Sequence, residues 1–160
     1  MKQRRLFAAV MLVAILALAL AGPASAAKLG GADQGGRLFT TNLSGAAEVD
    51  PTGELGAGDP DGSGSATLTV NPGQREVCYE LSVKDITLPA SGAHIHVGEA
   101  GETGPVVVPL TPPDASGVSS GCTEVSRELA KEILKNPGAY YVNVHTSDFP
   151  GGAVRGQLSK

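Results

Sequence analysis

Apolar and polar residues alternate in short stretches along this chain, and Gly, Pro, Asn and Asp separate the stretches. Alternation with a period of two is typical of β-strands that bury one face, and regular turn signals between such strands are typical of an all-β sandwich or barrel. The sequence therefore predicts strands at 39–43, 66–70, 77–83, 92–98, 105–110, 117–125, 139–146 and 153–159.

One turn and one helix interrupt the alternating pattern. In the segment 71–74, Asn-Pro-Gly-Gln has Pro and Gly where a type II turn takes them, which predicts a hairpin. Ser126 can cap a helix with an apolar stripe, and Asn136-Pro137-Gly138 ends it. A single short helix between strands fits a crossover packed on a sandwich. We expect a Greek-key β-sandwich or barrel of about eight strands with one helix at about 126–136.

The first residues have the features of a leader. Basic residues precede an apolar run from Leu6 to Leu20, and Ala24-Ser25-Ala26 offers a small-residue cleavage site. The alternative is an uncleaved membrane anchor, but the run is shorter than the roughly 20 residues that span a bilayer. Arg4-Arg5 is partly similar to a twin-arginine leader, although the strongly apolar run favours the general route. We expect a signal peptide at 1–26, a flexible arm at 27–36 and one domain at 37–160.

Composition and charge narrow the classes of function. The length of 160 residues allows one domain, and the chain is 41% apolar and only 4% aromatic. The segment 27–160 carries nine basic and sixteen acidic residues, a formal charge of −7. Such a charge repels nucleic-acid phosphates and anionic membranes. No second apolar run of spanning length exists, so we expect a soluble protein outside the cytoplasm, with no nucleic-acid partner and no membrane span after leader cleavage.

Both cysteines, Cys78 and Cys122, lie in the segment expected to be exported. An even count in an oxidising compartment predicts one disulfide rather than a catalytic or metal-binding pair. The long loop that such a bond closes would add about 3–4 kcal/mol to the free energy of unfolding.

The three histidines lie on two of the predicted strands. In 92–98, His94 and His96 share one face and the apolar residues share the other. In 139–146, His145 lies on the same face as Tyr141 and Asn143, opposite the apolar residues. If these two strands pair, three imidazoles converge on one patch outside the core.

Three imidazoles with an open fourth position suit copper or zinc, for which neutral histidine is the commonest ligand. The alternative is a set of surface histidines that hydrogen-bond to loops or meet solvent, because two histidines spaced by one residue are a weak signal. His94, His96 and His145 are therefore candidate metal ligands, and the register of the two strands decides between these interpretations.

Other candidate sites are weaker. The polar loop 45–64 contains Asp59-Pro60-Asp61-Gly62-Ser63, which is similar to the start of a calcium loop but lacks its distal Glu, so ordinary turn chemistry explains it. No Gly-x-Ser-x-Gly elbow, free thiol or phosphate-binding glycine loop is present. We expect Arg155 to be solvated or ion-paired.

Four segments carry a family resemblance: Ala93-His94-Ile95-His96-Val97-Gly98, then 104–110 (Gly-Pro-Val-Val-Val-Pro-Leu), 136–146 and 149–158. Together they closely resemble the CHRD (chordin-type) domain, and the resemblance covers about residues 37–159. It implies an extracellular β-sandwich module with no established catalytic activity.

A fainter similarity exists to copper-zinc superoxide dismutases. It implies that His94, His96 and His145 correspond to copper ligands of that family, and that Arg155 is anion-facing if its side chain reaches the same patch. This chain has no fourth histidine to bridge two metals, no zinc-site cluster and a differently placed disulfide, which argues against dismutase activity.

Three functions follow from these observations. The first is a secreted, non-enzymatic CHRD-type binding or structural module whose partner is an unknown extracellular protein or small ligand. The second is an extracytoplasmic copper- or zinc-binding protein that uses the three histidines. The third is an adhesion or matrix protein that self-associates.

Overall fold

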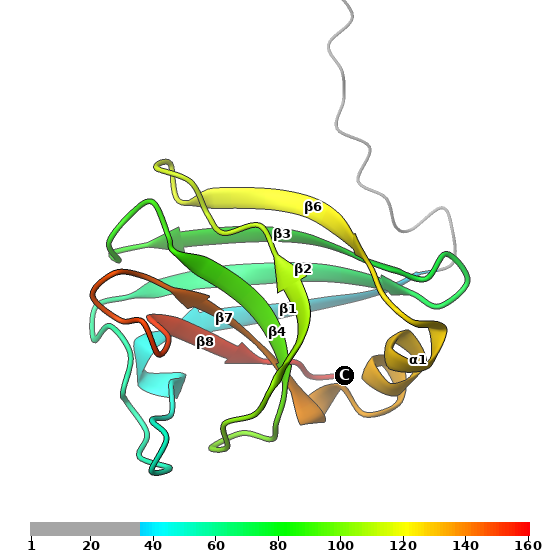
Figure 1. Ribbon diagram of the computed structural model, residues 1–160, viewed down its shortest axis with the longest axis horizontal. Helices are drawn as coiled ribbons and strands as arrows, with labels where there is room; N and C mark the ends of the chain where they lie inside the picture. The colour runs from blue at the N-terminus through cyan, green and yellow to red at the C-terminus, as the bar shows by residue number, and fades with distance from the viewer. Residues whose placement is uncertain (1–35) are drawn as a thin grey trace, which may run out of the picture.

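Eight antiparallel strands and one helix make up the computed structural model, which describes residues 36–160 (Figure 1). The predicted signal peptide and nearly all of the predicted arm lie outside the described residues. The strands are β1 (Arg37–Ser44), β2 (Ser63–Asn71), β3 (Glu76–Lys84), β4 (Gly92–Val97), β5 (Val106–Leu110), β6 (Val118–Glu124), β7 (Tyr140–His145) and β8 (Val154–Gln157).

The strands form one sheet in the order β5-β4-β7-β8-β1-β2-β3-β6. Two hydrogen bonds show that its two edge strands approach each other. The Thr123 hydroxyl of β6 donates to the Pro109 carbonyl of β5 at 3.0 Å, and the Ser119 hydroxyl donates to the Thr111 carbonyl at 2.8 Å. The sheet is therefore a nearly closed barrel, and the predicted all-β fold is confirmed. All eight predicted strands are present.

The turn between β2 and β3 differs from the prediction. The hairpin is present, but the residue with positive φ is Arg75 (φ 60°) rather than Gly73. The side-chain oxygen of Asn71 accepts hydrogen bonds from the amides of Gly73 and Gln74, at 2.9 and 3.1 Å. This side-chain capping winds the turn beyond Gly73, which moves the left-handed residue to position 75.

Helix α1 (Arg127–Lys135) confirms the predicted helix. The Ser126 hydroxyl accepts a hydrogen bond from the Leu129 amide at 3.0 Å, and Ala130 and Ile133 are buried. The helix lies at one end of the barrel, next to the short 3-10 turns η3 (Pro137–Ala139) and the start of β7 (Figure 1). No helix in the described part of the chain is long and apolar enough to cross a membrane. A second 3-10 turn, η2 (Gly45–Ala47), follows β1.

Alternate residues of most strands fill the interior of the barrel, whereas no side chain of β6 is part of the core. The core is mainly aliphatic because the other strands place apolar side chains at alternate positions. Residues that are at most 2% exposed there include Leu43, Leu68, Val77, Leu81, Ile95, Val108, Val142 and Val144.

The disulfide joins the paired strands β3 and β6. Cys78 and Cys122 lie directly opposite each other, with their Cα atoms 3.9 Å apart, and no described cysteine is free. The predicted pairing is confirmed.

Candidate metal centre

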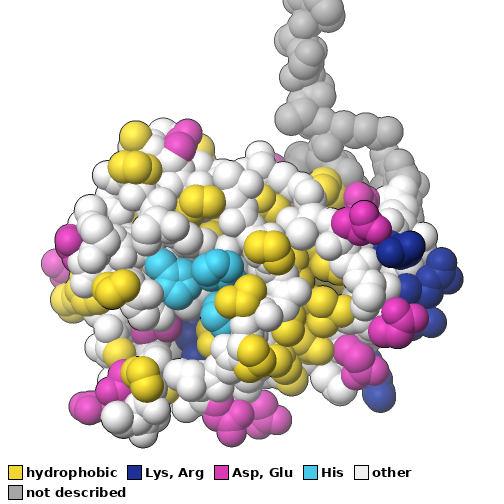
Figure 2. Space-filling model, in the orientation of Figure 1, with side chains coloured by type: hydrophobic (Ala, Val, Ile, Leu, Met, Phe, Trp, Pro, Cys, Tyr) yellow, Lys and Arg dark blue, Asp and Glu magenta, His cyan; other side chains and the backbone are white. Residues whose placement is uncertain are grey.

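Strands β4 and β7 pair in a register that brings the three histidines together. His94 lies opposite Asn143, and Gly92 lies opposite His145, on the face that points away from the barrel core. The pairing of β4 with β5 has a bulge between Ile95 and His96, a feature that redirects side chains. The two strands pair as the metal hypothesis required, and Figure 2 shows the histidines gathered on one face of the molecule.

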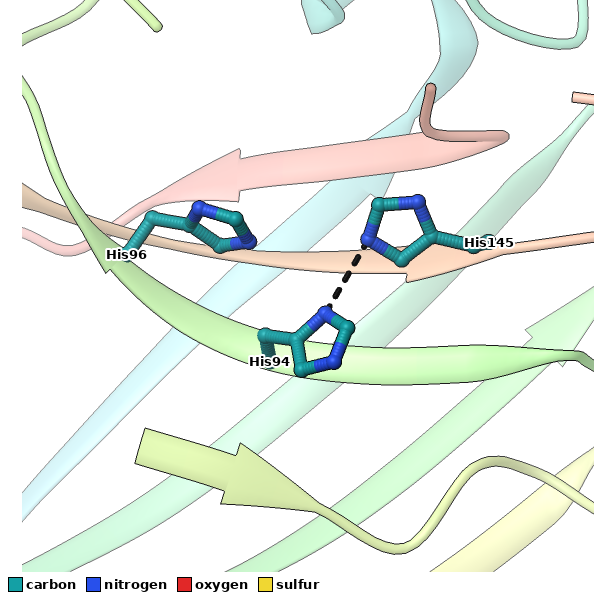
Figure 3. A group of neighbouring side chains, drawn as sticks. All are labelled: His94, His96 and His145. Atoms are coloured by element: carbon teal, nitrogen blue, oxygen red, sulfur yellow. Dashed lines mark hydrogen bonds between the residues drawn. The ribbon is translucent and has the colours of Figure 1, made fainter. Parts of the chain in front are cut away.

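The three rings present nitrogens to a common centre (Figure 3). The Nδ1 atom of His94 lies 3.1 Å from the Nε2 atom of His145. One nitrogen from each of the three rings lies within 4.8 Å of the others. Nitrogens that share one ion at about 2.0–2.1 Å lie about 3–4 Å apart. Small ring rotations therefore suffice to place all three on one ion.

Two backbone carbonyls set which nitrogen is available in the rings of His96 and His145. His96 Nδ1 lies 2.8 Å from the Gly104 carbonyl, and His145 Nδ1 lies 3.0 Å from the Pro150 carbonyl. Because a carbonyl only accepts, both Nδ1 atoms carry the proton, and both Nε2 atoms keep their lone pairs. Carbonyl partners of this kind orient metal-binding histidines and fix their tautomers.

Burial and mutual repulsion favour the neutral rings. Burial lowers the pKa of His94, and the positive charges of His145 and His96 lower it further. Burial also lowers the pKa of His145, although its hydrogen bond to the Pro150 carbonyl partly opposes the effect. The neutral imidazole is the form that binds a metal, so both shifts prepare the site at neutral pH.

One nitrogen of the triad has no partner in the protein. His96 is 8% exposed, and its Nε2 atom is fully buried without a hydrogen bond. A buried acceptor without a partner costs about 1–3 kcal/mol. A cation bound by His96 together with His94 and His145 would supply the missing interaction. The donor set, all imidazole nitrogen, fits copper and zinc.

Tyr141 stacks on His96, and Arg155 stacks on Tyr141. The rings of His96 and Tyr141 stack, with centroids 4.8 Å apart and planes at 10°. The Arg155 guanidinium lies 3.4 Å from the centroid of the same tyrosine ring. Two groups stacked this closely occupy opposite faces of Tyr141, so the tyrosine separates the guanidinium from His96.

The expectation of a solvated or ion-paired Arg155 is wrong. The side chain is 2% exposed, and its guanidinium donates to the carbonyls of Glu102 (2.7 Å) and Glu99 (2.9 Å) and to the side-chain oxygen of Gln157 (3.1 Å). Arg155 therefore holds the loop between β4 and β5 against β8. The anion-facing role that the dismutase similarity implies stays a prediction.

The outer face that carries the three histidines is mostly covered. Tyr141 and Asn143 are 3% and 2% exposed, because loops cover the outer surface of β4, β7 and β8. The segment 45–62, which belongs to the polar loop predicted at 45–64, covers part of this surface, and its Asp59 amide donates to the Ala153 carbonyl at 2.8 Å. In Figure 1 this loop (cyan to teal) and the β7–β8 loop (orange-red) lie on the same side of the barrel.

Sequence analysis missed Glu48 and gave Asn143 no role beyond its strand face. Glu48 lies in the covering loop and is 3% exposed, and burial raises the pKa of its carboxyl to about 7 despite the nearby positive charge of Arg155. The available signal was the position of this glutamate between Ala47 and Val49, because a charged residue flanked by apolar ones in a loop is unusual.

The other candidate ligands do not add to the site. The Asp59 carboxylate accepts a hydrogen bond from the Asp61 amide at 3.3 Å, which is turn chemistry. Within residues 36–160, the only other close set of metal-ligating atoms is Glu76 with Cys78 and Cys122. The sulfur atoms of these two cysteines are joined in the disulfide and offer no thiolate ligand.

Comparisons with known proteins identify the domain. The chain has no match among curated proteins or among solved structures. The family model of the CHRD domain matches residues 39–158, a span that contains all three histidines and both cysteines. The chain therefore belongs to the CHRD domain family.

Proposed function

We propose that this protein is a secreted, non-enzymatic CHRD-type binding module whose ligand is one copper or zinc ion, held by His94, His96 and His145. The observation that carries the proposal is the buried, unpartnered His96 Nε2 atom beside two further histidine nitrogens. Surface histidines without a ligand would direct their free nitrogens to solvent or to a hydrogen-bond donor instead.

Three observations support export. The predicted leader at 1–26 is followed by an acidic segment, the family is extracellular, and the Cys78–Cys122 disulfide fits an oxidising compartment. Export also places the site where the two candidate metals are not held by the thiol ligands of the cytoplasm.

The site favours binding over turnover. The chain has three histidines in total, so no fourth imidazole completes a two-metal centre of the dismutase type. Of the two candidate metals, copper(II) should bind more tightly, because nitrogen sites follow the order in which copper exceeds zinc. Neither dismutase activity nor a second metal is part of the proposal.

Metal-induced stabilisation tests the proposal. We expect copper(II) or zinc(II), added to the purified exported protein after chelator treatment, to raise the melting temperature. The stabilisation should reach about 2.7 kcal/mol when free metal is a hundredfold above its dissociation constant. It should weaken as the pH falls from 7.5 to 5.5, because protons compete for the ring nitrogens.

Variants assign the effect to the triad. The three single variants His94→Ala, His96→Ala and His145→Ala should each lose most of the shift, whereas Asp59→Asn, in the acidic turn, should keep it. The copper(II) complex should show nitrogen hyperfine coupling from imidazoles in electron paramagnetic resonance. No shift in the parent protein, or an equal shift in the histidine variants, would contradict the proposal.

A further inference from the structure

A pocket of about 400 Å³ opens beside the histidine triad. Its walls come from the loop after β1, the strands β4 and β7, the loop between β4 and β5, and the loop between β7 and β8. The volume is within the range of small-molecule sites. Polar lining residues include Glu48, His96 and Asn143, and apolar ones include Val49, Ala57 and Phe149.

Every buried side-chain atom that lacks a hydrogen-bond partner within residues 36–160 belongs to a residue of this pocket. These atoms are Glu48 Oε1, Asn143 Oδ1 and His96 Nε2. All three are acceptors when Glu48 is ionised: the His96 proton is on Nδ1, and the Asn143 side chain hydrogen-bonds to the Glu48 carboxyl, which leaves its oxygen free. These three atoms therefore lack a hydrogen-bond donor, and an occupant that carries N–H groups would supply one.

The charges around the pocket favour a cation. Glu48, Asp50 and Asp148 line it, and no Lys or Arg does. Arg155 lies near enough to Glu48 to affect the carboxyl, but its guanidinium donates to two carbonyls and Gln157. The desolvation that raises the Glu48 pKa is the cost that a bound positive charge would offset.

The Glu48 carboxylate lies close to the backbone of Gly152. Gly152 has φ 142°, and a Cβ atom placed on it would lie 2.3 Å from Glu48 Oε1. Only glycine permits this approach, so the loop between β7 and β8 is shaped around the carboxylate.

We propose that this pocket binds a small organic molecule carrying a primary ammonium group. The ammonium donates hydrogen bonds to Glu48 and Asn143, and the hydrocarbon part contacts Val49, Ala57 and Phe149. An ammonium ion has three N–H donors and no acceptor, which matches unpartnered acceptor atoms in a pocket that carboxylates line. The proposal does not require the metal, because Glu48 and Asn143 are not members of the triad.

Matched four-carbon probes test this inference on the metal-free protein. We expect n-butylammonium to bind at pH 8, measured by calorimetry or amide chemical shifts, at least tenfold more tightly than n-butanol or butyrate. Intermolecular Overhauser effects should connect its methyl group with the Phe149 ring. Equal binding of the alcohol, tighter binding of butyrate, or no binding of the amine would overturn the proposal.

Two substitutions locate the binding group. Glu48→Gln, which keeps the shape of the side chain, should weaken n-butylammonium binding at least tenfold, whereas Glu80→Gln, an exposed carboxylate on β3, should leave it unchanged. An unchanged affinity in Glu48→Gln overturns the proposal. If Glu48→Gln does not fold, the Overhauser contacts with Phe149 in the parent protein decide, since their absence has the same consequence.

The His94→Ala variant separates this inference from the proposed function. It should lose the metal-induced stabilisation and keep n-butylammonium binding. Amine binding that disappears together with metal binding would overturn the separate site, whereas failure of metal binding alone would leave the amine result intact.

Discussion

Two outer faces of the same barrel differ in solvent exposure. On β2, β3 and β6 the outward side chains, such as Thr67, Glu80 and Ser120, are exposed or half-buried. On β4, β7 and β8 most of the equivalent side chains, including Tyr141 and Arg155, are at most 8% exposed beneath covering loops. Both faces carry polar residues at every second position, so strand alternation alone does not distinguish them.

The difference shows which polar groups have a structural role and which are available for a ligand. A buried polar atom needs a partner, and most of those on the covered face have one. Gln157, for example, donates from Nε2 to the carbonyls of Gly98, Gly138 and Tyr140 at 2.7–3.0 Å. The three atoms left without partners all line the pocket beside the triad.

Substitution of Arg155 should have the largest effect on the free energy of unfolding, because it removes contacts that hold the covering loops. We expect Arg155→Met to lower the free energy of unfolding by about 3–5 kcal/mol, because two loop carbonyls and Gln157 lose a charged donor in a buried setting. Glu80→Gln on the exposed face should change it by less than about 0.5 kcal/mol. Chemical denaturation measures both. Similar values for the two variants would mean that the loops do not depend on Arg155.

Glu48→Gln should change stability in a pH-dependent way. The folded-state pKa of about 7 exceeds the ordinary 4.5, so the folded state holds the proton more strongly. The contribution of Glu48 to the free energy of unfolding is therefore complete below pH 4.5 and is lost as the pH rises through 7. The loss amounts to about 3 kcal/mol. The variant should match the parent at pH 4 and exceed its stability at pH 8.

Denaturant titrations of the metal-free proteins from pH 4 to 8 measure this difference. His94 and His145 act in the opposite direction, because their lowered pKa values reduce stability as the pH falls below 6.5. They are present in both proteins, so the difference between the two profiles isolates Glu48. Parallel profiles would show that the carboxyl is not desolvated.

Tyr141→Phe should have the smallest effect. The change removes the hydroxyl that accepts from the Gly104 amide at 3.3 Å, and keeps the ring between His96 and Arg155. We expect a loss of about 1 kcal/mol or less in the free energy of unfolding. Tyr79→Phe is the matched control, since its hydroxyl accepts from the Thr111 amide at 2.7 Å and should cost at least as much. A larger loss for Tyr141→Phe than for Tyr79→Phe would mean that the covering loops depend strongly on the hydrogen bond between the Gly104 amide and the Tyr141 hydroxyl.

Much of the fold follows from local patterns. The strands, the helix with its Ser126 cap and the Cys78–Cys122 pairing are all as expected, because each depends on side-chain periodicity, capping chemistry or cysteine count. The turn type at 71–74 was wrong because the hydrogen bonds of the Asn71 side chain outweighed the preference of Gly73 for positive φ.

The candidate site could be predicted only in part. The residue types and their shared strand faces identified His94, His96 and His145. The expected solvation of Arg155 was wrong, and Glu48 was missed, because burial of a polar face depends on loops that are distant in sequence.

The sequence by itself determined that alternate residues pack into a β-barrel core and that three histidines point away from it, since both follow from the two-residue period of a strand. Only the tertiary structure decided that β4 and β7 are neighbours and that loops close over one outer face. Those facts depend on strand register and on hydrogen bonds between distant segments, which no local pattern encodes.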